Sequence, residues 1–279
     1  MSEVFFVRTR HFYESYLDFF KLVELCGYPI IYVDEIDVSN DNVYIVAPMN
    51  GEYRPHIANQ NDKARNAYLI LWNLERPSGS AGSVGQYAQS NRDLMYNRYV
   101  DEVWVSDRWL AHETKWACRF VVLGSHYELG QPGADKTYDF AHMSVPISRR
   151  IEIYKHFGSI GPNTWPPERD EVLQRSRFGL NIHQDNHPFQ EPLRLALFAA
   201  YGLPIISETV YDGYPWVQDE TIIYSGFDGM VGKIAQVLKD DYSKFYELGM
   251  RGREFMCEQM RFDKMVNEAV EQSLGANWR

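Results

Sequence analysis

Arg194 stands in the first turn of a predicted apolar helix, where the helix dipole disfavours a cation. The segment from Asn181 to Glu208 reads NIHQDNHPFQEPLRLALFAAYGLPIISE, which predicts a strand, a polar loop, a helix that begins near Pro192, a turn and a second strand. A cation in the first turn of a helix costs roughly 0.3–1 kcal/mol. A bound anion would reverse that sign, because free N–H groups and a bidentate arginine both favour it. The residues indicate a phosphate or diphosphate site; the alternative is that Arg194 pairs with Glu191 or a nearby aspartate.

The polar loop before this helix contains further residues that could contact a ligand. His183 ends a predicted strand, and ligands of parallel sheets bind outside the carboxyl ends of the strands. His183 could contact phosphate or sugar or move a proton, and the alternative is a hydrogen-bonded structural histidine. His183, Asp185 and His187 have metal-ligating side chains, but no helix places them on one face. The sequence therefore predicts no metal site here.

The elements that must position these residues alternate along the chain. Apolar runs predict strands at 4–9, 29–36, 42–48, 67–75, 100–107, 119–124, 138–145, 177–184, 204–207 and 220–226. Helical spacing and stop signals predict helices at 11–28, 56–66, 108–117, 148–158, 166–176 and 192–201, with more helices to the end. Strands that alternate with helices indicate largely parallel sheets covered on both faces.

The linker-like composition of 125–139 suggests two α/β domains of similar size. We predict an N-terminal Rossmann-like domain at 1–133 and a second one at 134–279, whose last helix could pack back on the first. A length of 279 residues with 45% hydrophobic residues gives ample core for this arrangement.

Composition limits the classes of function. The apolar runs are far shorter than the roughly 18 residues of a membrane span, and the N-terminus lacks the pattern of a signal peptide. The three cysteines are an odd, scattered set, which suits a reducing compartment and predicts no disulfide framework. We therefore expect a cytoplasmic protein without a membrane span. A net charge of −10 argues against a protein that mainly coats nucleic acid, although a local basic face remains compatible with it.

The pattern SRFGLNIH…EPLRLALFAAYGLPIISE resembles the C-terminal half of glycosyltransferases with the GT-B fold, mostly the group-1 type and its spore-maturation-type relatives. The positions that match the family's Arg-x-Phe-Glu-Ala-x-Ala-x-Gly helix and Pro-Val-Val strand are Arg194, Ala200, Gly202, Pro204, Ile205 and Ile206. The resemblance implies an α/β fold of two Rossmann-like domains that face a cleft, with a somewhat reduced donor domain. It also implies that the start of this helix holds the diphosphate of a nucleotide-sugar donor.

The resemblance extends to other residues of the predicted donor domain. Arg149 and Arg150 stand in the loop SVPISRR, which is Gly-rich in the family, and they could reach phosphate or be solvated instead. The resemblance implies a ribose or sugar contact for Glu208 and a similar role for Glu191. Leu197 occupies the place of the family's second glutamate, which weakens the comparison.

Glycosyl transfer to a hydroxyl needs a proton acceptor if configuration is inverted. Glu75 and Asp107 each follow an apolar strand of the predicted acceptor domain, and we take both as candidates for this base. Either could instead form a salt bridge or cap a helix, Asp107 in particular because a helix follows it. A retaining reaction would require no such base. Asp34 and Glu35 are weaker candidates.

The leading hypothesis is a metal-independent glycosyltransferase that needs no cofactor beyond its nucleotide-diphosphate sugar. Its compact size resembles phage enzymes that glycosylate hydroxymethylated bases in DNA, which would require a basic face on the N-terminal domain. The residues that could supply this face are Arg8, Arg10, Arg54, Lys63, Arg65, Arg76, Arg92 and Arg98. The alternatives are an acceptor that is a cell-surface glycan, lipid or protein, a catalytically inactive nucleotide-binding module, and a nucleotide-sugar epimerase.

Overall fold

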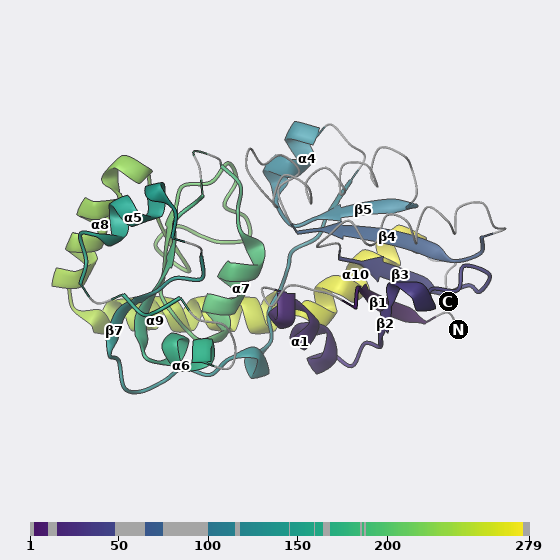
Figure 1. Cartoon of the computed structure of the whole chain (residues 1–279), viewed down its shortest axis with the longest axis horizontal. Helices are drawn as coiled ribbons and strands as arrows, with labels where there is room; N and C mark the ends of the chain where they lie inside the picture. The colour runs from purple at the N-terminus through teal and green to yellow at the C-terminus, as the bar shows by residue number, and fades with distance from the viewer. Residues whose placement is uncertain are drawn as a thin grey trace. The chain divides into compact units, whose positions relative to one another are not determined.

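The computed structural model describes residues 3–10, 16–47, 65–74, 100–114, 118–144, 146–158, 160–163, 168–184, 186 and 188–275. The chain forms two compact units, Met1–Val122 with Asp263–Arg279, and Leu123–Phe262. Each unit contains a parallel sheet with helices packed against it (Figure 1). No helix in the described part of the chain combines the length and apolarity that a membrane crossing requires.

The first unit is built on a six-stranded sheet with the order β2-β1-β3-β4-β5-β6, and every pairing in it is parallel. Its strands are β1 (Val4–Arg8), β2 (Ile30–Tyr32), β3 (Val43–Val46), β4 (Tyr68–Asn73), β5 (Glu102–Val105) and β6 (Arg119–Phe120). Its helices are α1 (Leu17–Leu25), α4 (Arg108–Thr114) and α10 (Phe262–Leu274).

Large aromatic side chains form the core of the first unit. Phe19 on α1 meets Phe6 and Trp72 edge to face, at ring distances of 5.8 and 5.6 Å. Trp72 meets Trp104 in the same way at 5.5 Å, and the indole N–H of Trp104 donates to Ser273 Oγ of α10 at 3.3 Å. The N-terminal sheet, α1 and α10 therefore share one continuous core.

The strand predicted at 29–36 is shorter in the structure. It ends at Tyr32, and Val33–Glu35 forms a 3-10 turn (η2). The carboxylate of Glu35 accepts a hydrogen bond from the Tyr32 N–H at 2.6 Å, which holds the backbone in this turn. The local side-chain bond therefore ends the strand that the apolar pattern alone would continue.

The second unit contains a four-stranded parallel sheet with the order β10-β9-β8-β7. The strands are β7 (Tyr138–Ala141), β8 (Ser176–Asn181), β9 (Ile205–Glu208) and β10 (Ile223–Ser225). The helices are α5 (Ser148–Tyr154), α6 (Glu168–Gln174), α7 (Pro192–Ala200), α8 (Phe227–Lys239) and α9 (Tyr242–Glu254), and a π-helical turn, η4, follows at Phe255–Gln259. A single parallel bridge joins Phe140 to Ile160. Ile160 therefore pairs with one side of β7, and β8 pairs with the other side. The connections from β7 diverge at this point, which makes its carboxyl end a topological switch point, where ligands of such sheets bind.

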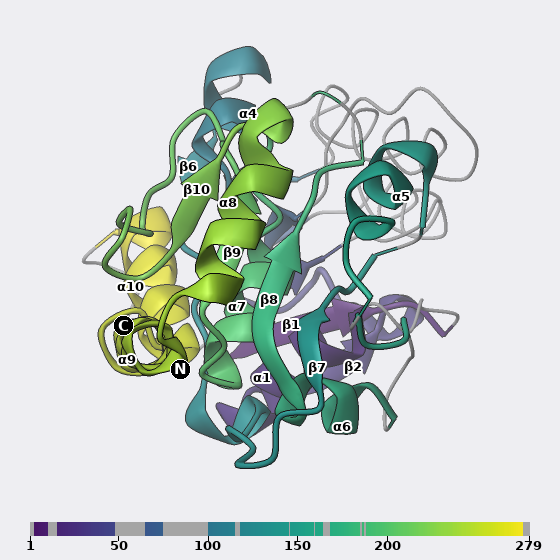
Figure 2. The same cartoon turned by 90° about the vertical axis from the view of Figure 1, so that its left-hand side faces the viewer.

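Alternation along β8 assigns the two faces of this sheet. Phe178 and Leu180 join an apolar cluster that includes Ile234 of α8. Gly179 points the other way, and a Cβ on it would lie 2.6 Å from the ring of Phe198 on α7. Figure 2 shows α8 in front of the sheet and α7 behind it. The missing side chain of Gly179 thus lets α7 approach the backbone of β8 closely.

Helix α7 begins and ends as the sequence predicts. Pro192 occupies the first helical position, and the helix stops at Gly202, whose φ is +63°. The N–H of Gly202 donates to the carbonyl of Ala199 at 2.8 Å, and that of Leu203 donates to the carbonyl of Phe198 at 3.1 Å, which is a Schellman motif. Glycine is favoured at Gly202 because other residues rarely adopt a positive φ.

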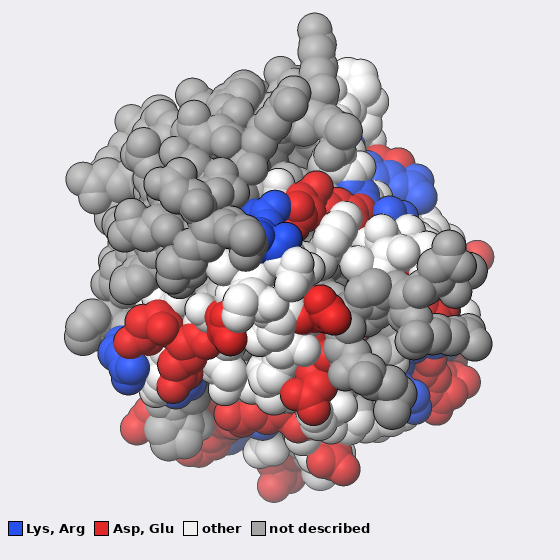
Figure 3. Space-filling view, turned by 90° about the vertical axis from the view of Figure 1, so that its right-hand side faces the viewer, with Lys and Arg blue, Asp and Glu red and all other residues white. Residues whose placement is uncertain are grey.

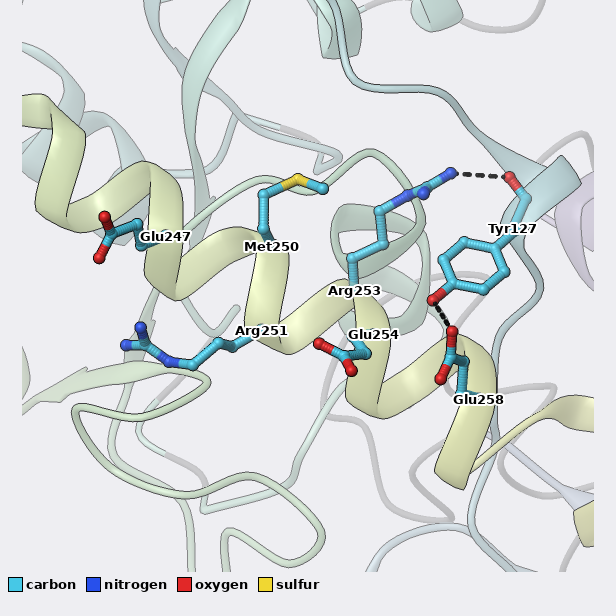
Figure 4. Close-up of a pocket in the computed structure, with 7 residues that line it drawn as sticks. All are labelled: Tyr127, Glu247, Met250, Arg251, Arg253, Glu254 and Glu258. Atoms are coloured by element: carbon cyan, nitrogen blue, oxygen red, sulfur yellow. Dashed lines mark hydrogen bonds between the residues drawn. The ribbon is translucent and has the colours of Figure 1, made fainter.

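Arg253 of α9 ties the end of α7 to the segment that enters the second unit. Its Nε donates to the carbonyl of Ala200 at 2.7 Å, and one terminal nitrogen donates to the carbonyls of Tyr127 and Gly130, both at 3.0 Å. Figure 4 shows this guanidinium directed at Tyr127 within a surface pocket that also contains carboxylates. Arg253 also donates to Gln131 Oε1 at 3.3 Å and lies over the ring of Tyr127 at 4.5 Å, so its contacts hold these segments together.

Candidate functional site

The candidate site lies at the carboxyl edge of the second sheet. Parallel strands end at the same edge, so Ala141, Asn181 and Glu208 mark it as the last residues of β7, β8 and β9. The segment after β7 leads into α5, and the segment after β8 leads into α7. The structure brings Arg149, Arg150, His183, Glu191, Arg194 and Glu208 together in this unit, as the bonds described below show.

Arg194 is anchored by three groups at this edge. Its Nε donates to the carbonyl of Met143 at 3.0 Å, and one terminal nitrogen donates to Asn181 Oδ1 at 2.6 Å. The same nitrogen forms an ion pair with Glu191, three residues earlier. The alternative stated for Arg194, a pairing with Glu191, is therefore what the structure contains. This pairing also explains how a cation is accommodated in the first turn of α7.

Arg150 is buried and shares Glu191 with Arg194. Its side chain is 4% exposed, its Nε donates to the carbonyl of Ile182 at 2.8 Å, and a terminal nitrogen lies 3.5 Å from Glu191 Oε1. Burial and the charge of Arg194 lower the pKa of Arg150. Arg150 is therefore not the solvated surface side chain that one interpretation of the sequence allowed.

Arg149 pairs with the other carboxylate of the cluster. A terminal nitrogen contacts Glu208, and the guanidinium lies over the ring of Phe227 at 3.6 Å. Its Nε is buried and has no hydrogen-bond partner among the described residues. A buried donor without a partner costs about 1–3 kcal/mol, which an oxygen ligand at this place would recover.

Glu208 also fixes the start of the loop that follows β8. Its Oε2 accepts a hydrogen bond from the His183 N–H at 2.8 Å and lies 4.0 Å from His183 Nδ1. His183 is 4% exposed. The pair therefore links β9 to the segment after β8. The bond uses the backbone N–H of His183, so it does not distinguish a structural from a functional imidazole.

The three arginines and two glutamates together leave one positive charge uncompensated. Glu191 is 22% exposed and serves both Arg150 and Arg194, while Glu208 serves Arg149. The three arginines are largely buried and lie near the start of α7 and the switch point of the sheet. Such a cluster suits a doubly charged phosphate group.

His142 lies beside this cluster, and sequence reasoning did not select it. The sequence predicted a strand over 138–145, whereas β7 ends at Ala141, so His142 is the first residue beyond the strand. Its side chain is 7% exposed and its Nδ1 has no partner among the described residues. Burial lowers its pKa to about 4. An interaction of the imidazole with the backbone of Ser144 opposes this shift, and the charges of Arg194 and Arg150 add to it. A polar residue at a strand end was the signal that could have identified it.

The candidates for a catalytic base belong to the first unit or lie outside the described residues. Asp107 is 2% exposed, and its Oδ1 accepts a hydrogen bond from the Leu110 N–H at 2.9 Å, which is the helix-capping alternative. Glu75 lies outside the described residues, as do Asp185 and His187. The catalytic roles of Glu75 and Asp107 stay predictions.

The weaker candidates Asp34 and Glu35 are held by local bonds. Asp34 pairs with Arg10 at 2.9 Å, and Glu35 accepts the Tyr32 N–H. Within the described residues no group of three potential metal ligands is found.

Carboxylates neutralise two of the three described members of the predicted basic face. Arg10 pairs with Asp34, Arg65 pairs with Asp101, and Arg8 donates to Tyr32 Oη at 2.7 Å. Figure 3 shows Asp and Glu side chains gathered over the lower half of the face it presents, with Lys and Arg scattered among them. The remaining members, Arg54, Lys63, Arg76, Arg92 and Arg98, lie outside the described residues.

No family model and no curated protein sequence matches the chain. Solved structures do match it. HepE from Anabaena, in complex with UDP-glucose, has a TM-score of 0.65 and 9% identity over 98% of this chain and 100% of that chain. BGT of T4 phage, in complex with UDP and Mn²⁺, has a TM-score of 0.57 and 12% identity over 98% of this chain and 99% of that chain. TarM has a TM-score of 0.59 and 13% identity over 94% of this chain, which spans 58% of TarM.

These similarities establish the fold that the sequence predicts. The chain has a GT-B-type α/β fold with parallel sheets, as the glycosyltransferases HepE, BGT and TarM have.

Proposed function

We propose that this chain is a glycosyltransferase that takes its sugar from a nucleotide-diphosphate sugar bound in the second unit. The observation that carries the proposal is the cluster of Arg149, Arg150 and Arg194 at the carboxyl edge of the second sheet, which two glutamates neutralise only in part. The GT-B fold and the nucleotide ligands named for HepE and BGT support a UDP-sugar as the first donor to test.

The arginines would act on the leaving group. Cleavage of the bond between sugar and diphosphate builds negative charge on the departing oxygen, and preorganised cations stabilise that charge without reorganising. In this proposal Arg194 and Arg150 turn from Glu191 to the diphosphate, and Arg149 contributes its unpartnered Nε.

The carboxylates released by this exchange would bind hydroxyl groups. Glu191 and Glu208 are acceptors whose arginine partners the diphosphate takes over. We assign them to the ribose or the sugar, and we place His183, which Glu208 already holds, at the same end of the donor. Glu75 and Asp107 remain our candidates for the base that deprotonates the acceptor. Their assignment rests on their positions after strands of the first unit.

Metal independence is also part of the proposal. The arginines can supply the charge that a divalent cation would otherwise supply to a diphosphate. One BGT structure contains Mn²⁺, so the assay should compare activity in EDTA with activity in Mn²⁺ and Mg²⁺. Full activity in EDTA is the expected result.

For the acceptor we propose a hydroxymethylated base in DNA. The match with T4 phage BGT covers 99% of the BGT chain. Another matching structure is that of the DNA-modifying enzyme β-glucosyltransferase. The rival acceptors are a cell-surface glycan, a lipid or a protein. Transfer of radiolabelled sugar to DNA that contains 5-hydroxymethylcytosine, with unmodified DNA as the control, separates these choices. The cytoplasmic location that the sequence predicts stays a prediction.

Release of nucleoside diphosphate from a panel of nucleotide sugars tests the proposal. Arg194→Ala should lower kcat/KM by roughly 100-fold, the size of effect that follows loss of one charge-stabilising group. Arg177→Ala is the matched control, because Arg177 lies at the amino end of β8 and pairs with Asp139 at 3.2 Å. Equal turnover by wild type and Arg194→Ala would contradict the site.

A catalytically inactive binding module is the second candidate. Leu197 supports it, because the position that the family fills with a glutamate holds a side chain that is 3% exposed and part of the core. Hydrolysis or transfer of any nucleotide sugar in the panel would argue against this candidate.

A further inference from the structure

His142 occupies a fixed position beside the arginine cluster. It directly follows β7, and the carbonyl of the next residue, Met143, accepts the bond from Arg194 Nε. Its ring packs on that of Tyr154 on α5 at 4.6 Å, and the hydroxyl of Tyr154 lies 3.1 Å from Ser144 Oγ. The imidazole is therefore held by its neighbours before any ligand binds.

The surroundings of His142 leave one of its nitrogens unused. Nδ1 is buried and has no hydrogen-bond partner among the described residues, although most buried polar atoms in proteins have one. The groups around the ring come from several elements: Arg150 and Tyr154 on α5, Arg194 on α7, Ser144 after β7, and Glu191, which neutralises the two arginines in part. A group that binds to these arginines would come within reach of the unused nitrogen.

We propose that His142 is a further donor-binding residue, whose Nδ1 hydrogen-bonds an oxygen of the diphosphate held by Arg150 and Arg194. This inference rests on the proposed function and adds to it a contact that the resemblance did not imply. A residue that only packed on Tyr154 would not need a nitrogen at this position.

Diphosphate binding would change the protonation of His142. In the free protein burial and two positive charges keep His142 neutral, with a pKa of about 4. A bound diphosphate offsets those positive charges and favours the imidazolium, so it raises the pKa of His142. Between the free and the bound pKa, binding takes up a proton, and donor affinity therefore increases as the pH falls.

Two variants separate a hydrogen bond from packing. His142→Phe keeps a ring on Tyr154 and removes the nitrogen, whereas His142→Asn keeps a nitrogen near the position of Nδ1 and cannot titrate. Inorganic pyrophosphate, titrated calorimetrically at fixed pH, should bind His142→Phe roughly 10-fold more weakly than wild type, as expected for the loss of a hydrogen bond to a charged group. His142→Asn should stay within roughly threefold of wild type, because its amide replaces that bond.

Proton uptake gives the second readout. UDP-glucose is suitable because its diphosphate is esterified at both ends and does not titrate near neutral pH. Titrations in buffers of different ionisation enthalpy should show proton uptake for wild type at pH 6 and less in both variants.

The outcomes distinguish the two proposals. Wild-type affinity of His142→Phe for pyrophosphate overturns the role of His142 while leaving the arginine site intact. Equal weakening in the two variants, accompanied by a lowered Tm, indicates a packing role and also overturns it. A wild-type protein that binds pyrophosphate but no nucleotide sugar contradicts the proposed function and leaves the His142 contact to be judged on the pyrophosphate data. A wild-type protein that binds neither contradicts both.

Discussion

At the scale of single residues, the carboxylates of the candidate site would compete with a bound anion for the same arginines. Glu191 holds Arg194 and Arg150, and Glu208 holds Arg149, so each arginine already has a carboxylate partner. The proposed diphosphate would have to displace these partners, and its binding free energy would be what remains after that exchange. Removing an internal carboxylate should therefore improve the binding of a simple anion.

Glu191→Gln tests this competition. The glutamine keeps the shape of the side chain and removes the charge, so inorganic pyrophosphate should bind roughly fivefold more tightly, on the order of 1 kcal/mol for a partly exposed ion pair. The control is Glu171→Gln, which removes an exposed carboxylate on α6 that pairs with Arg175 and should leave the affinity unchanged. Isothermal titration calorimetry measures both. An unchanged affinity in Glu191→Gln would show that Glu191 does not restrain the arginines.

His142 also makes stability depend on pH. Its pKa in the folded protein is about 4, below the ordinary value of 6.5, so the unfolded chain binds more protons in between. This contribution to stability is complete above pH 6.5 and is lost as the pH falls towards 4. The free energy of unfolding of wild type should drop by on the order of 2 kcal/mol more than that of His142→Phe between pH 7 and pH 5. Urea unfolding at both pH values measures this difference, and parallel losses in the two proteins would count against it.

The sequence predicted part of this site for physical reasons that are local. Arg194 was selected because a cation in the first turn of a helix is unusual, and Pro192 and Gly202 marked the ends of that helix. The burial of Arg150 and the isolation of His142 depend on how α5 packs against the segments after β7 and β8. Spacing in the sequence does not encode that packing, so these features required the structure.

At the scale of elements, the approach of α7 to β8 positions Arg194 beside Asn181. This approach depends on Gly179, because the ring of Phe198 occupies the space that a side chain at this position would need. Helix α7 and its start would move if this contact were widened.

Gly179→Ala should therefore destabilise the protein. The added Cβ would lie 2.6 Å from Phe198, and overpacking of this kind costs typically 1–3 kcal/mol. Gly232→Ala is the matched control: it lies within α8 with nothing within 4 Å of an added Cβ, and it should stabilise by roughly 0.5–1 kcal/mol. Urea unfolding of the two variants measures their free energies of unfolding, which should change in opposite directions. A neutral effect of Gly179→Ala would mean that α7 tolerates a shift.

The element order was predictable from periodicity, and the element ends were less so. Strands β1, β3, β4 and β5 lie within the predicted apolar runs. Only three residues of the strand predicted at 29–36 form β2, because the Glu35 carboxylate accepts a hydrogen bond from the backbone N–H of Tyr32. The run at 138–145 ended at Ala141, and that difference is what places His142 at the edge of the sheet.

At the scale of the whole molecule, the two parallel sheets agree with the prediction from the alternating pattern, and the GT-B-type fold agrees with what the family resemblance implies. The compact units divide after Val122, and α10 belongs mainly with the first unit. The sequence allows the last helix to pack back on the first domain, but its apolar pattern does not select that unit, because its amphipathic face would suit either sheet. The predicted domain roles, acceptor first and donor second, stay a proposal.

The DNA hypothesis belongs to this scale, because it depends on charge over a whole face. The net charge of −10 disfavours binding to the negatively charged phosphates of DNA. Any specific binding should therefore appear at low ionic strength and weaken steeply with added salt. Fluorescence anisotropy with a short duplex that contains 5-hydroxymethylcytosine measures this dependence. An affinity below detection at low salt would reject DNA as the acceptor and favour a glycan, lipid or protein.

The most direct test of the account is calorimetric titration of wild type, Arg194→Ala and Arg177→Ala with UDP, UDP-glucose and the diphosphates of the other nucleosides. The account predicts that wild type and Arg177→Ala bind at least one of these ligands with equal affinity. It predicts that Arg194→Ala binds that ligand at least roughly 10-fold more weakly, since a charge-assisted contact is lost. Equal affinity of wild type and Arg194→Ala, or no binding of any nucleoside diphosphate by wild type, would contradict the diphosphate site.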